Sequence, residues 1–180
     1  MSVKVPVIKV NNRGERFVLF FRPHEVNGMC SNWYMSDFVD KEGKVNFNCG
    51  EQYMMYEKAK LFKDYKVAQE ILKETNPKEM KKYGRKVKNY DDKLWSCHRY
   101  NVMVQGLYCK FSQNPDLKDW IIKADCNYFV ECSPYDAIWG IKTPMSSDSC
   151  LYPEKWNGEN LLGKCLIDVR GIIMAGVNKK

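Results

Sequence analysis

The chain has 180 residues, 44% of them hydrophobic and 28% charged, and its 29 Lys or Arg against 22 Asp or Glu give a formal net charge of +7. This composition is typical of a globular protein, and the length suffices for one domain with a buried core. No apolar run is long enough to cross a membrane, and the N-terminus lacks the apolar segment of a signal peptide. We therefore predict a single cytoplasmic domain over residues 1–180, without a membrane partner.

The eight cysteines form no Cys-x-x-Cys pair, and His24 and His98 are the only histidines. Zinc sites need a different set and spacing of ligands. Reduced, mostly buried thiols fit a cytoplasmic protein better than a disulfide framework does. We expect neither a metal nor a cofactor.

The predicted strands are short and the predicted helices dominate, so the expected fold class is mainly α: a single-domain helical array with minor short β-strands. Strands are predicted at 17–22, 45–47 and 128–132. Helices are predicted at about 51–62, 65–74, 77–83, 92–110, 115–123 and 159–174, with a further helix opening at Pro134.

Positive charge gathers in residues 57–88, which hold eleven Lys or Arg and five Asp or Glu, and so carry most of the net charge. Such a concentration favours a partner that bears phosphate, either a nucleotide or a nucleic acid. The charges are interleaved with Glu70, Glu74 and Glu79, as on a solvated helical face, so that alternative stays open.

Two acidic residues lie near the expected starts of helices, Glu51 after Asn48 and Asp136 after Ser133. Asp136 stands three residues before Trp139, and a carboxylate beside an indole suits cleavage of a base–sugar bond, because the ring stacks on the base and the acid stabilises positive charge on the sugar. A capping box, in which the carboxylate bonds an exposed backbone N–H, explains either acid equally well.

Lys58 follows Glu51 by seven residues and shares its helical face. A partly buried lysine there binds phosphate or attacks a sugar carbon. On the next long helix, Trp95 and Arg99 are spaced to hold a base and its phosphate, although a core tryptophan covered by an arginine stem has the same pattern.

Several other mechanisms are excluded by the motifs. Cys97 and His98 are adjacent on a helix and point in different directions, so they do not form a nucleophile–base pair. The chain contains neither a Walker loop nor a dinucleotide-binding glycine pattern after a strand.

Motifs spread over residues 17–171 together resemble the NADAR superfamily, also called YbiA-like. They are Ser31-Asn32-Trp33-Tyr34 for the family's Ser-Asn-Phe-Tyr, Gly50-Glu51-Gln52-Tyr53 with Lys58, Gly84-Arg85-x-Val87, Trp95-x-x-x-Arg99, Lys110-Phe111-x-Gln113-Asn114, Glu131-x-Ser133-Pro134-x-Asp136-x-Ile138-Trp139-Gly140, and Trp156-x-Gly158-x-Asn160-Leu161-Leu162-Gly163 with Arg170.

The resemblance implies a mainly helical N-glycosidase. One branch of the family cleaves ribosylamino-pyrimidine intermediates of riboflavin biosynthesis, and another removes ADP-ribose from guanine in nucleic acid, reversing DarT-type toxins. Glu51, Trp95, Asp136 and Trp139 match its functional positions, and Lys58 matches a further candidate. Two departures, Gln52 for the commoner His and Lys142 for a Gly, leave the substrate branch open.

The resulting hypothesis is hydrolysis of the C1′–N bond of a ribosylated base. Glu51 and Asp136 share the tasks of stabilising an oxocarbenium-like cation, activating water and orienting the sugar, while Lys58 offers a rival route through a Schiff base. The predicted substrate-binding residues are Asn32, Tyr53, Arg85, Trp95, Arg99, Lys110 and Trp139, and of these Arg85, Arg99 and Lys110 are the candidates for the phosphates.

The charge concentration leads us to favour ADP-ribosylated guanine in DNA as the substrate, over the riboflavin intermediate. A toxin–antitoxin pairing with an ADP-ribosyltransferase would follow from that choice. A protein that binds ADP-ribose or NAD without cleaving it remains the alternative from another class, because a fold by itself does not establish turnover.

Overall fold

The structure, a computed structural model, describes residues 5–177. Six α-helices carry most of the regular structure: α1 (Gly50–Leu61), α2 (Tyr65–Lys73), α3 (Pro77–Arg85), α4 (Asp92–Gln113), α5 (Pro115–Lys123) and α6 (Leu161–Val177). The strands are β1 (Lys9–Val10), β2 (Arg16–Phe20), β3 (Phe38–Val39), β4 (Asn46–Phe47) and β5 (Tyr128–Glu131). Three short 3₁₀ helices are η1 (Gly28–Cys30), η2 (Asp148–Leu151) and η3 (Pro153–Lys155). The predicted fold class, mainly α with minor strands, is confirmed.

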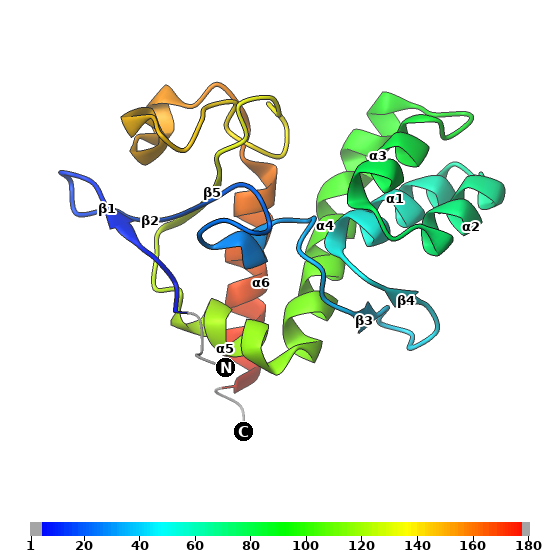
Figure 1. Ribbon diagram of the computed structural model, residues 1–180, viewed down its shortest axis with the longest axis horizontal. Helices are drawn as coiled ribbons and strands as arrows, with labels where there is room; N and C mark the ends of the chain where they lie inside the picture. The colour runs from blue at the N-terminus through cyan, green and yellow to red at the C-terminus, as the bar shows by residue number, and fades with distance from the viewer. Residues whose placement is uncertain (1–4, 178–180) are drawn as a thin grey trace.

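The strands form two small sheets (Figure 1). In the first, β2 is central: β1 pairs with it antiparallel and β5 pairs with it in parallel, Phe17 opposite Tyr128 and Phe20 opposite Glu131. Parallel pairing needs a long crossover, and here the crossover contains α1 to α5. The second sheet pairs β3 with β4.

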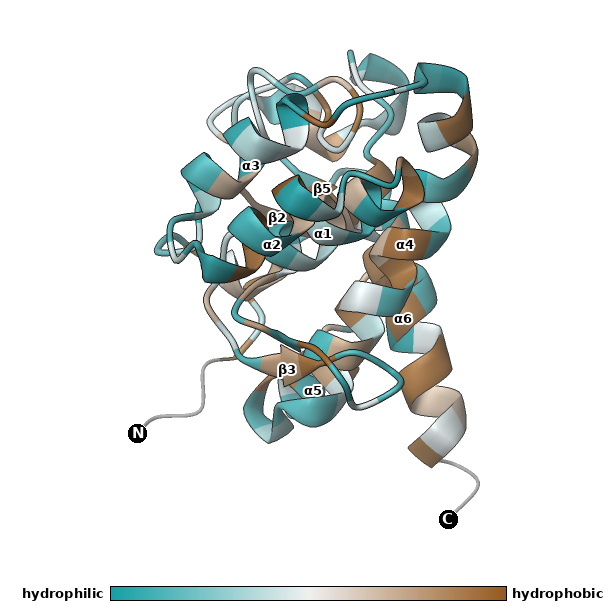
Figure 2. Ribbon diagram, turned by 90° about the vertical axis from the view of Figure 1, so that its right-hand side faces the viewer, coloured by the Kyte–Doolittle hydropathy of each residue, from teal (hydrophilic) through white to brown (hydrophobic). Residues whose placement is uncertain are grey.

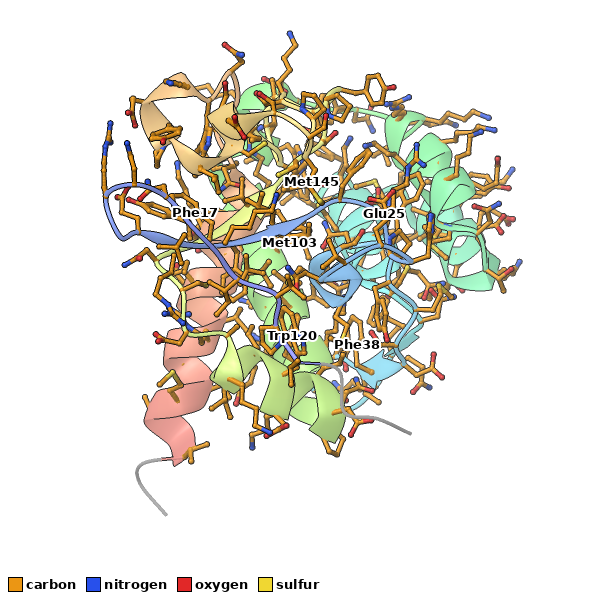
Figure 3. The ribbon with its side chains drawn as sticks, turned by 60° about the vertical axis from the view of Figure 1, so that its left-hand side comes forward. Phe17, Glu25, Phe38, Met103, Trp120 and Met145 are labelled. Atoms are coloured by element: carbon orange, nitrogen blue, oxygen red, sulfur yellow. The ribbon has the colours of Figure 1, made fainter. Side chains whose placement is uncertain are left out.

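Helix α4 is the central helix of the fold. It packs against α1, α5 and α6, and Figure 1 shows the larger sheet on one side of α4 and α6 and helices α1 to α3 on the other. Hydrophobic residues run along both α4 and α6 where they lie side by side (Figure 2). Met103 of α4 is fully buried in the same core cluster as Phe38 and Trp120, and Phe17 of β2 belongs to a second, smaller cluster (Figure 3).

Helices α2, α3 and α4 begin where side chains accept the first free N–H groups. Asp64 accepts from Val67 at the start of α2, and Asn76 accepts from Lys78 at the start of α3. Pro77 occupies the first turn of α3, where its missing N–H costs nothing. Asp91 caps α4, as predicted.

Helix α1 departs from the prediction at its first residue. Its N-cap is Cys49 rather than Asn48, and the residue that reaches back to bond a backbone N–H is Gln52, whose Oε1 accepts from Asn48 at 2.8 Å. The Nε2 group of Gln52 donates to the carbonyls of Ile71 and Glu74, each at 3.0 Å. The capping-box role predicted for Glu51 is therefore wrong, because its neighbour performs it.

The helix predicted at Pro134 does not form, and residues 132–142 are a loop. The loop turns back on β5 because the Ile141 N–H bonds the Glu131 carbonyl at 3.0 Å. Loop carbonyls accept instead from the segment that enters α6, Ala137 from the Glu159 N–H and Trp139 from the Leu162 N–H. The carbonyls that would accept hydrogen bonds within a helix therefore accept them from the segment at the start of α6.

Candidate active site

One large pocket, of about 870 Å³, lies where β5, its following loop, α1, α3 and the start of α4 meet. Its volume is within the range of about 300–1,000 Å³ usual for small-molecule sites. The side chains that matter for chemistry come from six segments and comprise Asn32, Trp33, Glu51, Lys58, Lys81, Arg85, Trp95, Glu131, Asp136 and Trp139. Seven of the ten residues predicted to form the site line this pocket.

Glu51 lies in the first turn of α1 and is 3% exposed. The indole Nε1–H of Trp33 donates to its Oε2 at 3.3 Å, while Oε1 is buried without a hydrogen-bond partner among residues 5–177. Burial raises the pKa of Glu51 to about 7, against the opposing attraction of Lys81 and the Trp33 hydrogen bond. A carboxyl group with such a pKa exchanges protons near neutral pH.

Asp136 is held by its own loop. Its Oδ1 accepts the backbone N–H groups of Ile138 at 2.9 Å and Trp139 at 2.8 Å, and its Oδ2 lies 3.7 Å from the Lys81 Nζ. The hydroxyl of Ser133 in turn accepts the Asp136 N–H at 3.1 Å. Two backbone donors and a lysine stabilise the charged carboxylate and fix its direction. Asp136 keeps a cap-like role although no helix follows it.

A third carboxyl group, Glu131, stands at the end of β5. Its N–H donates at 3.1 Å to the Oδ1 of Asn160, the residue directly before α6, and this bond fixes its backbone. Its Oε2 is buried and unpartnered within the described chain. Burial, then the negative charge of Asp136, raise the pKa of Glu131 to about 8. The three acids thus differ in their partners: Asp136 accepts hydrogen bonds from its own loop, whereas Glu51 and Glu131 each keep a buried oxygen without a partner in the described chain and have a raised pKa.

The basic side chains of the pocket come from α1 and α3. Gly84 lets α3 approach α1 closely, because a Cβ there would collide with the Met55 side chain. This contact brings Lys81 and Arg85 to the pocket wall. Lys58 lies with its Nζ 4.2 Å from the ring centroid of Tyr90. Burial, then the positive charge of Arg85, lower the pKa of Lys58.

Aromatic rings line the rest of the pocket. Trp95, from the first turn of α4, is 6% exposed, and the Lys58 ammonium lies 5.9 Å from its ring centroid. Trp139 comes from the loop that carries Asp136, and Tyr135 of that loop is 83% exposed. Flat rings beside acids give the pocket surfaces on which a base can stack.

Three predicted substrate-binding residues do not line the pocket. Tyr53 packs in the core against Phe47, with ring centroids 5.0 Å apart. Arg99 faces Glu159, its Nη2 3.7 Å from the carboxylate. Lys110 is fully buried and donates to two backbone carbonyls, as described next.

Lys110 supports the site from behind. Its Nζ donates at 3.0 Å to the carbonyls of Met29 and Ser31, and burial lowers its pKa to about 8. The bonded turn leads directly to Asn32, whose carbonyl accepts the Glu51 N–H at 2.9 Å. Lys110 therefore fixes the segment that carries Trp33 and the start of α1, and its contacts are with backbone rather than phosphate.

Sequence reasoning missed three pocket residues: Trp33, Lys81 and Glu131. Glu131 shares a motif with Asp136, but its place in the predicted strand 128–132 does not indicate that its side chain faces the pocket. Lys81 belongs to the basic region 57–88, whose charge favours a partner that bears phosphate but does not indicate which lysine lines the pocket. Within residues 5–177 no cluster of three or more His, Cys, Asp or Glu is arranged to hold a metal ion.

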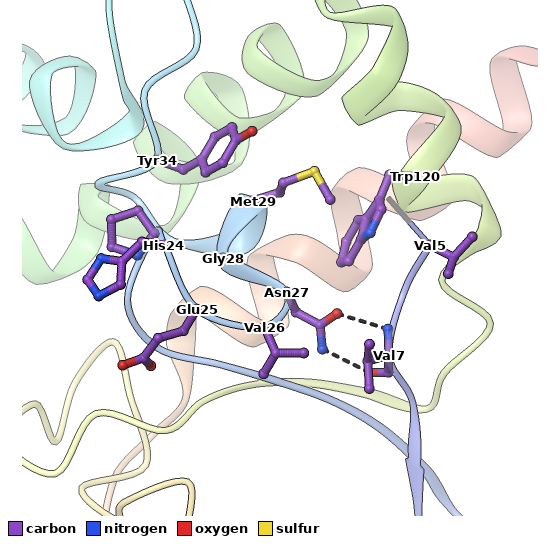
Figure 4. A pocket seen from close by; sticks show the side chains of 11 residues that line it. Val5, Val7, His24, Glu25, Val26, Asn27, Gly28, Met29, Tyr34 and Trp120 are labelled. Atoms are coloured by element: carbon purple, nitrogen blue, oxygen red, sulfur yellow. Dashed lines mark hydrogen bonds between the residues drawn. The ribbon is translucent and has the colours of Figure 1, made fainter. Parts of the chain in front are cut away.

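A smaller cavity, of about 390 Å³, lies beside η1 (Figure 4). Asn27 crosses one wall, accepting the Val7 N–H at 2.9 Å and donating to the Val7 carbonyl at 2.8 Å. Pro23 and His24 line both cavities. The ionisable side chains that line this cavity are His24, Glu25 and Tyr34. They include one carboxyl group against the three of the larger pocket, so we assign the chemistry to the larger pocket.

The model of the NADAR domain matches residues 19–174. The chain belongs to the NADAR domain family. Relatives include "Protein irg-1" of Caenorhabditis elegans, 39% identical over 94% of this chain and 84% of its own length. Another is "N-glycosidase R617" of Acanthamoeba polyphaga mimivirus, 34% identical over 78% of this chain and 84% of its own length.

The fold also matches a solved NADAR relative. The NMR structure of the Escherichia coli protein YbiA superposes with a TM-score of 0.77 and 22% identity, covering all of this chain and 97% of that one. Weaker similarity reaches the "Riboflavin biosynthesis protein PYRR, chloroplastic" of Zea mays, 28% identical over 62% of this chain but only 17% of its own length. In the part of the chain that the structure describes, every helix is too short or too polar to cross a membrane.

Proposed function

We propose that this NADAR protein is an N-glycosidase that hydrolyses the C1′–N bond between a ribose and a base. The observation that carries the proposal is the convergence of Glu51, Glu131 and Asp136 in one pocket walled by indoles and basic side chains. Cleavage of this bond builds positive charge on the sugar, and carboxylates stabilise such charge. The relative R617, which shares 34% identity, is itself named an N-glycosidase.

In the proposed reaction the base stacks against Trp95 or Trp139 and the ribose lies over the acids. Asp136, whose direction is fixed by its loop N–H groups, faces the sugar carbon and stabilises the developing cation. Glu51 has a pKa of about 7, and its ionised form accepts a proton from the attacking water. Lys58 and Arg85 reach the phosphates, and Arg85 offers two parallel donors.

The lysine route remains the rival mechanism at the same site. The lowered pKa of Lys58 increases its fraction of free amine, which is the form that attacks an opened ribose to give a Schiff base. Trapping with borohydride separates the routes, because reduction of a Schiff base leaves the sugar covalently bound to Lys58, and direct attack by water leaves nothing to trap.

We favour ADP-ribosylated guanine in DNA as the substrate. The support is the set of basic residues at the pocket, which suits a diphosphate, together with the lysines of α2 and α3 beyond it. Several of those lysines pair with nearby glutamates, such as Lys82 with Glu79 at 2.6 Å. A ribosylamino-pyrimidine with one phosphate is the second candidate, favoured by the similarity to PYRR.

The test is incubation of wild type with an oligonucleotide carrying ADP-ribosylated guanine and, separately, with a ribosylamino-pyrimidine phosphate, followed by chromatography of the released sugar and base. We expect release of ADP-ribose by wild type and its loss in Asp136→Asn. Cleavage of the pyrimidine alone would move the protein to the riboflavin branch. Binding of ADP-ribose in calorimetry without cleavage of either substrate would contradict the proposal and favour a binding module.

A further inference from the structure

We propose that Glu131 is a further catalytic residue, the acid that delivers a proton to the departing base. This inference rests on the proposed function and adds a role that Asp136 and Glu51 do not fill. A base leaves a sugar poorly as an anion, so an acid that protonates it as the C1′–N bond breaks speeds the step.

The position of Glu131 fits that role. It is the last residue of β5, at the edge where the strand opens onto the pocket. Its backbone is held on both sides, the N–H by Asn160 at 3.1 Å and the carbonyl by the Ile141 N–H at 3.0 Å. Its Oε2 finds no hydrogen-bond partner in residues 5–177 although it is buried. A fixed acid with a free oxygen in a pocket is arranged to meet a ligand rather than the protein.

The charges around Glu131 keep a proton on it. Asp136 faces it from the loop and Glu51 faces it from α1, and the negative charge of each raises the pKa of Glu131. Lys81 from α3 opposes them, but lies 3.7 Å from Asp136 and is shared with it. The other ionisable groups of the pocket wall are Arg22, His24, Lys58, Arg85 and Tyr135. Carboxyl groups that share one site cannot all ionise easily, so Glu131, whose Oε2 has no hydrogen-bond partner in the described chain, keeps its proton.

The step balances with water as its only co-reactant. The C1′–N bond breaks and its electron pair goes to the base, which takes the proton from Glu131 and leaves neutral. The water oxygen bonds to C1′, and the water proton passes to Glu51. Transfer of that proton through solvent returns Glu131 to its acid form, and the net reaction consumes one water.

A pair of substrates isolates this role: an oligonucleotide with ADP-ribosylated guanine, and the same oligonucleotide methylated at N7 of that guanine. Methylation gives the base the positive charge that protonation would supply, so its departure no longer needs an acid. We expect Glu131→Gln to slow cleavage of the unmethylated substrate by about 10²–10⁴-fold and of the methylated one by less than about 10-fold. Glu70→Gln, on the exposed face of α2, is the control and keeps both rates.

The pH dependence gives a second readout on the unmethylated substrate alone. Wild-type kcat/KM should fall above about pH 8, as Glu131 loses its proton, and Glu131→Gln should lack this fall. An equal loss of rate on both substrates, or an unchanged alkaline fall in Glu131→Gln, overturns the proposal for Glu131. Wild type that cleaves neither oligonucleotide overturns the guanine substrate favoured above and not the role of Glu131, so the two failures are distinct.

Discussion

The first turn of α1 and the loop at 132–142 carry the same sequence signal, an acid three residues after a polar residue, yet they use it in opposite ways. In the loop, Asp136 accepts two backbone N–H groups and pairs with Lys81. In α1, Gln52 bonds the backbone and Glu51 keeps one oxygen free. The comparison teaches that a neighbouring amide can release a carboxylate from capping and leave it available for chemistry.

The largest expected effect is on turnover when either acid is neutralised. Asp136→Asn should lower kcat by about 10²–10⁴-fold, because the side chain can still accept the loop N–H groups but no longer carries the charge that stabilises the cation. Glu51→Gln should lose a similar factor. Steady-state kinetics measures both, and circular dichroism checks that the fold is kept. Near-normal turnover in Asp136→Asn would remove it from the mechanism.

Substitutions of Gln52 and of Glu51, both in α1, should have different effects on the free energy of unfolding. Gln52→Ala removes hydrogen bonds to Asn48, Ile71 and Glu74 and leaves buried groups unpaired, so we expect a loss of about 2–3 kcal/mol in the free energy of unfolding. Glu51→Gln should cost less than about 1 kcal/mol, since no backbone group depends on it. Urea unfolding at pH 7 measures both. A larger loss in Glu51→Gln would mean that its carboxylate has a structural role.

The difference in the free energy of unfolding between Glu131→Gln and wild type should depend on pH. The folded pKa of Glu131, about 8, lies above its ordinary value, so its contribution to stability is complete at low pH and is lost as the pH rises toward 8. Gln does not titrate. We therefore expect the variant to gain stability relative to wild type by about 1–3 kcal/mol between pH 5 and pH 9, measured by urea unfolding at both values. A difference that stays constant with pH would contradict a buried, protonated Glu131.

The smallest effect concerns Trp33. Its Nε1–H donates to Glu51 and lowers the pKa of that carboxyl group. Trp33→Phe removes the donor, so the pKa of Glu51 should rise and the acidic limb of the kcat/KM profile should move to higher pH by about half a unit to one unit. Trp156→Phe, whose indole bonds the Cys150 carbonyl away from the pocket, is the control. A limb that does not move would show that another group sets it.

Most helices could be predicted from the sequence because their caps and apolar stripes are local signals. Asp91, Asn76 and Pro77 mark their helices correctly. The loop after β5 could not, because a capping pattern does not reveal that Ala137 and Trp139 give their carbonyls to the start of α6. Only the distant contact decides between helix and loop.

The residues of the candidate site could be predicted from the sequence in part. Glu51, Asp136, Lys58 and the two tryptophans reach the pocket that the motifs indicated. Lys110 could not be distinguished from a phosphate ligand by sequence, since its burial under the turn at Met29 and Ser31 is a tertiary fact. Glu131 was hidden because a strand end gives no sign of which acid faces a cavity.

The most direct test of this account is a pH titration of the glutamate carboxyl carbons by carbon-13 NMR, with Glu51→Gln and Glu131→Gln to assign the two signals. The account predicts two glutamates that titrate far above the rest, one near pH 7 and one near pH 8. Titration of every glutamate near its ordinary value of about 4.3 would contradict the claim that this pocket holds two buried acids poised for proton transfer.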